Sequence, residues 1–402
     1  MHWKFSRPAL FFLLSSFIFG MGAAQLQLHL NFYLAALEVP ASLQGVINAL
    51  PAVAFILTAL PGAVLSSRIG LTRTLQLGGL LTLLGLVGTA LSTSPLGIGL
   101  AVLLEGAGAA IIGVASAPFM TQNSDDNTRV PLFSLELALI TGAGFLGNLL
   151  GGLIPQLYAG AVGISVQSAA ALRVALLCGA AFQLLSLIPL LFIPNTRAEK
   201  PLGRRSRLEQ PRKVVAFVLP TALLGLGAGL TIPYLNVFIE GKFHISYSSL
   251  GALFAWTSLT TAATALIQPA LVRRLGEVRT VLLVQGLSLP FMAVLGFSPS
   301  LLLVGSSLFI RGALANASGP VYSAYTMRQL PEADRTLFAA LSPMAWSAAF
   351  ALSNLISGVV RSQLEFSSAF HVLFSLTLLL YAASLGVLYW VLERRKLGLM
   401  RV

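Results

Sequence analysis

Two charged residues lie inside long apolar stretches of this 402-residue sequence. Glu105 stands in LLEGAGAAIIG and Arg311 in LFIRGALAN, 206 residues further along the chain. Each lies about ten residues into its stretch, which is ~15 Å along a helix and near the middle of a bilayer. A charge there costs at least ~2.5 kcal/mol unless it is paired or faces water. We therefore expect Glu105 and Arg311 to pair, directly or through water or a ligand, and Glu105 to bind and release a proton. The alternative is a static structural pair.

Polar and aromatic residues recur at helical spacing near these charges, so that members of each group share a helix face. They predict an aromatic cavity with few fixed charges, suited to a moderately lipophilic or polyhydroxy solute. Helix packing is the alternative interpretation for each of them. The candidates are Gln25, His29 and Tyr33 in the first half of the chain, Tyr234 and Phe238 at the corresponding positions of the second half, and Ser318, Tyr322 and Tyr325 beyond Arg311.

A third acid, Glu136, also lies in an apolar stretch. It follows Arg129 by seven residues, which is about two helical turns. We expect these two residues to form a structural ion pair rather than to take part in proton transfer.

The composition identifies lipid as the solvent for the elements that carry these residues. The chain is 56% hydrophobic and 9% charged, with a mean hydropathy of +0.86, whereas soluble domains are about one quarter charged. The single cysteine, Cys178, excludes a disulfide within the chain. There is no Walker-type nucleotide motif and no His-x-x-x-His pair, so we expect no enzyme activity, no cofactor and no metal site.

Twelve apolar runs are long enough to be transmembrane helices, each of which needs about 20 residues. The sequence thus predicts an all-α membrane protein with twelve transmembrane helices in two pseudo-symmetric six-helix bundles. The runs cover residues 8–37, 43–65, 74–91, 95–120, 131–158, 171–193, 214–239, 250–272, 280–297, 301–327, 337–360 and 369–392.

The basic residues predict how these helices are oriented. Of the 25 Lys and Arg residues, 21 lie at the termini and in alternate loops, 3 lie in the opposite loops, and Arg311 lies within a span. By the positive-inside rule both termini are cytoplasmic. This distribution also accounts for the net charge of +12 through contact with anionic lipid headgroups, and it argues against a nucleic-acid partner.

The two halves of the chain resemble each other. GMGAAQLQLHLNFYL at residues 20–34 matches GLGAGLTIPYLNVFI at residues 225–239, and LSSRIGLTRTL at 65–75 matches LVRRLGEVRTV at 271–281. The sequence therefore predicts an N-terminal bundle at residues 1–193, a basic cytoplasmic linker at 194–213 and a C-terminal bundle at 214–402. The loop residues that recur between the halves are Arg68 and Arg274, Gly70 and Gly276, and Arg73 and Arg279.

With these features the whole chain resembles the major facilitator superfamily. The loop after the second span is similar to that family's G-x-L-x-D-R-x-G-R-R pattern, although Ser67 and Arg273 stand at its acidic position. EGAGAA at 105–110 is similar to the fourth-span pattern G-x-G-A-A, and AGFLGNLLGG at 143–152 resembles the fifth-span antiporter motif. The residues that carry this last resemblance are Gly147, Asn148, Gly151 and Gly152.

The resemblance implies a monomeric secondary transporter in the cell membrane that works by alternating access. It places the first, fourth, seventh and tenth spans, and so Glu105 and Arg311, around a central cavity. We expect proton-coupled efflux of a small organic compound. Uptake or facilitated diffusion of a neutral solute such as a sugar is one alternative. A membrane receptor that binds a solute without transporting it is another.

Overall fold

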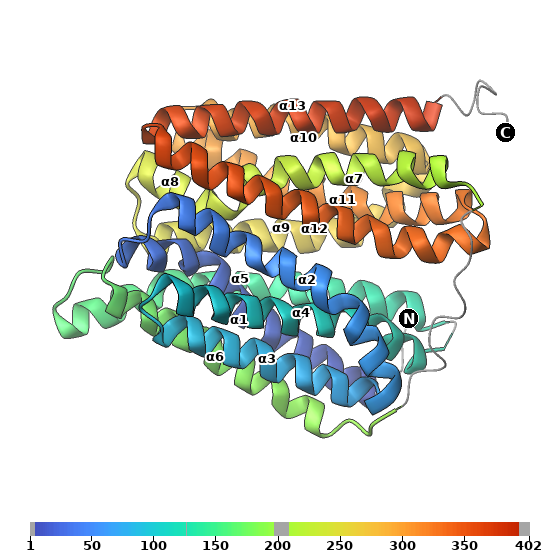
Figure 1. Ribbon diagram of the computed structural model, residues 1–402, viewed down its shortest axis with the longest axis horizontal. Coiled ribbons are helices and arrows are strands. Elements are labelled where there is room, and N and C mark those ends of the chain that lie inside the picture. Colours follow the sequence, from blue (N-terminus) through green and yellow to red (C-terminus); the bar gives the residue numbers. More distant parts are fainter. Residues whose placement is uncertain (1–4, 126, 197–208, 394–402) are drawn as a thin grey trace. The chain divides into compact units, whose positions relative to one another are not determined.

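The computed structural model describes residues 5–125, 127–196 and 209–393, and over these residues it contains helices and no strand (Figure 1). The predicted all-α fold is therefore confirmed. The helices are α1 (Arg7–Ala36), α2 (Ala41–Ile69), α3 (Leu71–Leu91), α4 (Pro95–Gln122), α5 (Arg129–Val162), α6 (Ala169–Leu191), α7 (Pro211–Thr231), η1 (Ile232–Tyr234), α8 (Leu235–Phe243), α9 (Tyr247–Leu275), α10 (Glu277–Phe297), α11 (Leu301–Gln329), α12 (Glu332–Gln363) and α13 (Phe366–Glu393).

Serine caps begin three of the helices in the first half. The hydroxyls of Ser6, Ser94 and Ser168 accept hydrogen bonds from backbone N–H groups in the first turns of α1, α4 and α6. These N–H groups have no partner inside the helix, so the serines fix where each helix starts. Proline at the first or second position of α1 and α4 supports the same starts, because its missing N–H is not needed there.

A proline interrupts the seventh predicted span. Pro233 lies in η1, a single 3₁₀ turn that separates α7 from α8. Proline has no N–H to donate and its ring collides with the preceding turn, so a continuous α-helix is not favoured here. The three elements together form one stretch, Pro211–Phe243, that is long and apolar enough to cross a membrane.

The hydropathy of the helices identifies a multi-pass membrane protein. Within the described residues, ten helical stretches are long and apolar enough to span a bilayer. The remaining predicted spans correspond to α9 and α11, each of 29 residues. Large apolar side chains on the surface agree with lipid contact: Leu60, Leu100 and Leu302 are 70%, 60% and 78% exposed.

The helices form two compact units. The first consists of Met1–Gly203 with Asn236–Ala262, and the second of Arg204–Leu235 with Ala263–Val402. The predicted division at residues 193 and 214 stays a prediction, and residues 197–208 of the predicted linker lie outside the described residues.

The same packing pattern occurs inside each unit. In the first, α1 packs against α5 and α6, while α3 packs against α4 and α6. In the second, α7 packs against α12 and α13, while α10 packs against α11 and α13. These four contacts of the first unit thus have their counterparts six spans later, as the internal repeat predicts.

Candidate functional site

Glu105 lies in the first unit and Arg311 in the second. Glu105 is the eleventh residue of α4, about 15 Å from its start. Its side chain is half-buried, and it forms no hydrogen bond or ion pair with any described residue of its unit. The pairing of Glu105 with Arg311 stays a prediction.

Arg311 is 6% exposed and has a tyrosine as its neighbour on α13. Its Nη2 donates a hydrogen bond to the Tyr381 hydroxyl at 3.2 Å, and its guanidinium carbon lies 5.6 Å from the centre of that ring. Its Nε has no hydrogen-bond partner among the described residues. An arginine does not lose its charge in proteins, so this buried cation retains an N–H group able to bind an acceptor. No motif or spacing pointed to Tyr381, because residues 70 positions apart come together only through the fold.

The polar face of α1 binds α5. The side-chain amide of Gln25, completely buried, donates from Nε2 to the carbonyl oxygen of Gly147 at 2.7 Å. His29 Nδ1 donates to the carbonyl oxygen of Gln25 at 2.9 Å, and the ring lies against Gly151 of α5, where an added Cβ would be 3.0 Å from His29 Cε1. Both side chains thus fasten α1 to α5 within the bundle, and their place in a substrate cavity stays a prediction.

Tyr33 joins the end of α1 to the end of α3. It is fully buried, and its hydroxyl lies 3.0 Å from the carbonyl oxygen of Ala90 and 2.9 Å from that of Ser92. Arg173 of α6 reaches the same place, donating from Nε to Ala90 at 2.9 Å and from Nη2 to the tyrosine hydroxyl at 3.4 Å. Tyr33 therefore holds the end of α1 against the end of α3 and against Arg173 of α6.

In the second unit, Tyr234 occupies the position that corresponds to His29. It is fully buried, and its hydroxyl donates to Asn354 Oδ1 at 2.9 Å. The guanidinium carbon of Arg361 lies 3.8 Å from the centre of the ring, which is a cation–π contact. In the sequence Arg361 counts only as a loop charge near the end of a span, so this contact was not expected. Phe238, one turn on and in the first unit, is also buried and lies 5.1 Å from Lys242 Nζ.

The three polar candidates beyond Arg311 bind neighbouring helices of the second unit. Ser318 accepts a hydrogen bond from Gln285 Nε2 of α10 at 3.2 Å. Tyr322 donates to the carbonyl oxygen of Phe217 on α7 at 2.6 Å. Tyr325 packs against the apolar core that Tyr322 and Phe217 belong to. They hold α11 within its bundle, and their contact with a substrate stays a prediction.

The motif on α5 packs against two helices. A Cβ atom added to Gly147 would lie 2.7 Å from the carbonyl oxygen of Met21 on α1, and one added to Gly152 would lie 2.5 Å from that of Tyr247 on α9. Asn148 Nδ2 bonds its own helix at Gly144 and reaches Ser258 Oγ of α9 at 3.3 Å. The small residues therefore permit close helix contacts, which is the packing role that such residues have in membranes.

The loop motif makes the same corner in both units. Gly70 and Gly276 each join two helices and have φ of 95° and 77°, with ψ of 159° and 163°, a conformation that L-residues with side chains rarely adopt. Thr74 Oγ1 donates to the Gly70 carbonyl oxygen at 2.7 Å, and Thr280 Oγ1 donates to that of Gly276 at the same distance. The repeat found in the sequence is thus also a repeat of backbone conformation and hydrogen bonding.

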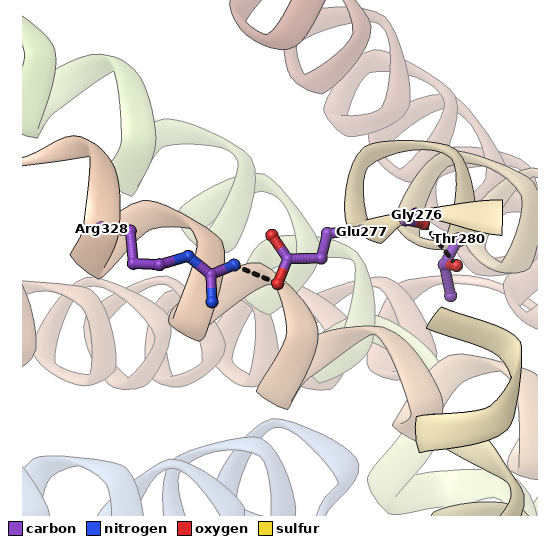
Figure 2. Close-up of polar contacts among 4 residues, drawn as sticks. All are labelled: Gly276, Glu277, Thr280 and Arg328. Carbon is purple, nitrogen blue, oxygen red and sulfur yellow. Dashed lines mark hydrogen bonds and ion pairs between the residues drawn. The ribbon is translucent and has the colours of Figure 1, made fainter. Parts of the chain in front are cut away.

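Figure 2 shows the second corner with its ion pair. In the first corner the residue after the glycine is Leu71, which has no charge. Glu277, which follows Gly276, pairs with Arg328 at the end of α11. The side chains are 27% and 58% exposed, and such exposed pairs contribute ~1 kcal/mol or less. The other motif arginines, Arg68, Arg73, Arg274 and Arg279, are exposed.

One expectation about the acids is wrong. Glu136 forms no ion pair with Arg129 or with any other residue in the described part of the chain. Two helical turns separate these residues along α5, and Glu136 instead lines a cavity inside the first unit.

Comparisons with known proteins agree with the sequence resemblance. The model of the Major Facilitator Superfamily matches residues 217–399. No curated protein sequence gives a match. Among solved structures, a D-xylose–proton symporter is 15% identical, with a TM-score of 0.76, over 94% of this chain and 96% of that one. A bacterial homolog of the human lysosomal transporter Spinster, inward-facing and unoccupied, is 13% identical, with a TM-score of 0.75, over 96% of both chains. The nucleoside transporter NupG is 14% identical, with a TM-score of 0.71, over 94% of this chain and 98% of that one. These likenesses show that the chain shares the fold of these proteins.

Proposed function

We propose that this chain, which has the major facilitator fold and matches the superfamily model over residues 217–399, exports a small organic compound in exchange for protons. It works by alternating access, as a monomer in the cell membrane with both termini in the cytoplasm. Glu105 carries the proton, and Arg311 is its electrostatic counterpart.

The observation that carries this proposal is the environment of Glu105. A carboxylate about halfway along a transmembrane helix is costly when charged and unpaired. The side chain is half-buried and has no hydrogen bond or ion pair with a described residue of its unit. Binding a proton would neutralise it, and approach of a cation would favour its release. A carboxylate free to change between these states is what a proton carrier needs.

Arg311 supplies the cation in this mechanism. Tyr381 holds its guanidinium group from one side, while Nε keeps an N–H available. Contact between Glu105 and Arg311, direct or through water or substrate, would favour the charged carboxylate. Loss of that contact in the other state of the transport cycle would favour its protonation. Proton binding and conformational change are thereby coupled.

The direction of transport rests on the α5 motif, which resembles that of efflux antiporters. The glycines of this motif make close helix contacts, and such contacts are compatible with either direction. Import is the second candidate, and it is favoured by the similarity to a D-xylose–proton symporter. The aromatic candidates Tyr234, Phe238, Tyr322 and Tyr325 suit a moderately lipophilic or polyhydroxy substrate in both cases.

Accumulation assays in cells distinguish these possibilities. Labelled lipophilic cations, neutral antibiotics and sugars are tested in cells that express the wild type or Glu105→Gln, with and without a protonophore. Glutamine keeps the shape of glutamate but cannot carry a proton. We expect the wild type to lower the accumulation of one compound. The mutation and the protonophore should each abolish this effect.

The matched control is Glu365→Gln, which removes an exposed carboxylate between α12 and α13 and should transport like the wild type. If the wild type raises accumulation, the protein imports. Normal transport by Glu105→Gln with unchanged pH dependence would show that Glu105 is not the carrier.

A further inference from the structure

A second acid lines a cavity that lies inside the first unit. The cavity lies between α1, α3, α4, α5 and α6 and has a volume of about 30 Å³. Its polar lining consists of one carboxylate, Glu136, and four serines, Ser15, Ser16, Ser116 and Ser186; the other lining residues are leucine, isoleucine, phenylalanine and a glycine. No basic side chain and no second acid lines it among the described residues.

The packing of the helices brings these polar groups to one level. Gln25 of α1 bonds Gly147 of α5, so at this level the two helices lie side by side with residue numbers that differ by 122. The same difference places Glu136 of α5 level with residues 14–16 of α1. Ser15 and Ser186 are in direct contact, since Ser15 Oγ lies 2.7 Å from the Ser186 carbonyl oxygen. All five polar residues lie ~8–14 Å from the helix ends that face the basic loops.

Three of the serines offer only lone pairs to the cavity. Ser15 donates its hydroxyl proton to the Ser186 carbonyl oxygen, Ser186 to that of Gln183 and Ser116 to that of Ile112, each at 2.7 Å. A hydroxyl has one proton and two acceptor lone pairs, so these oxygen atoms remain acceptors. Ser16 is 7% exposed and makes no hydrogen bond with a described residue.

Glu136 has no neutralising partner within the described residues. It forms no ion pair or hydrogen bond with them, and the cavity faces of α1, α3, α4 and α6 contribute no Lys, Arg, His, Asp, Tyr or Cys. A buried charge without a partner is strongly unfavourable. A group of acceptors around one negative charge therefore has the composition of a cation site.

We propose that this cavity binds a small monovalent cation, either a proton or Na⁺, with Glu136 as its counter-charge and the serine oxygens as ligands. Oxygen ligands suit hard cations. One carboxylate balances one positive charge, whereas a divalent ion would leave an excess charge in an apolar cavity. A bound proton would turn Glu136 into a donor toward Ser16, and a volume of about 30 Å³ has room for a small ion, since a single water needs ~10–15 Å³ of such volume. The site is separate from Glu105 and does not depend on the proposed direction of transport.

Thermal unfolding of the purified full-length protein tests this inference. The unfolding midpoint, Tm, is measured while NaCl replaces choline chloride at constant ionic strength, and separately in choline chloride from mildly acidic to mildly alkaline pH. At ~100 times Kd, a ligand that binds only the folded state raises the folded-to-unfolded ratio ~100-fold. A rise of Tm with Na⁺ identifies Na⁺, and a rise only with acid identifies the proton.

Variants assign the response to the cavity. Glu136→Gln should remove it and Ser16→Ala should weaken it, while Glu365→Gln and Glu105→Gln should keep it. Loss of the response in Glu105→Gln but not in Glu136→Gln would overturn the inference, as would a wild type whose Tm responds to neither Na⁺ nor acid. If Glu136→Gln does not fold, the Tm response of Ser16→Ala tests the inference instead, because this variant leaves the carboxylate in place. An unweakened response would then overturn the inference. Failure of transport by Glu105→Gln alone leaves this test unaffected.

Discussion

At the residue scale, a buried carboxylate holds the start of the second half. Asp334, in the first turn of α12, is completely buried. Its Oδ1 accepts a hydrogen bond from the backbone N–H of Glu209 at 2.9 Å, and its Oδ2 accepts one from that of Gln210 at 2.8 Å. These N–H groups directly precede α7, so Asp334 anchors the chain where it enters that helix.

We expect Asp334→Ala to destabilise the second unit. Two partly buried N–H groups lose their acceptor, and a typical hydrogen bond contributes ~0.5–1.5 kcal/mol to stability. The measurement is the Tm of the purified protein. Glu365→Ala is the control and should leave Tm unchanged, because the side chain is exposed. An equal Tm for both variants would show that these two hydrogen bonds contribute nothing to stability.

Residue types and spacing predicted helix faces but not the partners of those faces. Gln25 and His29 share a face, as their spacing requires, and that face binds α5. A period of 3.6 residues gives the direction of a side chain and says nothing of which helix covers it. For the same reason the expected Glu136–Arg129 pair was wrong, and the contacts of Arg361 and Asp334 were not foreseen.

At the scale of elements, α5 depends on close contacts along one half of its length. A Cβ on Gly152 would meet Tyr247, Ser248 and Gly251 at 2.5–3.2 Å, whereas a Cβ on Gly160 of the same helix would have no atom within 4 Å. Alanine substitutions at these two positions therefore separate the effect of packing from the effect of helix propensity on stability.

Gly152→Ala should lower the Tm, because overpacking a tight contact costs ~1–3 kcal/mol. Gly160→Ala should keep or raise the Tm, because alanine is favoured over glycine in helices by up to ~1 kcal/mol. Thermal unfolding of the two variants under identical conditions is the measurement. A higher Tm for Gly152→Ala than for Gly160→Ala would contradict the close α5–α9 contact.

Element boundaries followed from sequence where local chemistry sets them. The first run, predicted at residues 8–37, is α1 at Arg7–Ala36, since Ser6 and Pro8 fix its start. The seventh, predicted at 214–239, extends from Pro211 to Phe243 as three helical pieces. Hydropathy marks the apolar part of a span, and polar residues that prolong the helix beyond it leave no such signal.

At the scale of the whole molecule, the loops carry a strong charge asymmetry. Of the basic residues, 21 lie on one side of the predicted topology and 3 on the other. By the positive-inside rule we expect the basic side to be cytoplasmic.

Cysteine labelling in intact cells tests this orientation. Cys178 is the only cysteine, so Cys178→Ser provides a background for Asn127→Cys, in the loop between α4 and α5, and Pro299→Cys, between α10 and α11. Both positions are exposed. An impermeant maleimide should label position 299 in intact cells and position 127 only after the cells are permeabilised. The reverse pattern would invert the topology.

The repeat was the most informative feature of the sequence at this scale. Matches 205–206 residues apart, with six spans in each half, predicted two similar bundles, and four helix contacts of the first unit recur in the second. Substrate and direction did not follow, because they depend on the few side chains at the site rather than on the fold.

The corners at Gly70 and Gly276 limit how this molecule can move. A single residue joins α2 to α3 and another joins α9 to α10, and in each case a threonine hydroxyl ties the next turn to the glycine carbonyl. Such a joint has no spare length that could be taken up by bending or sliding. We therefore expect a displacement at the Gly70 end of α2 to be passed directly to α3, and one at the Gly276 end of α9 to α10.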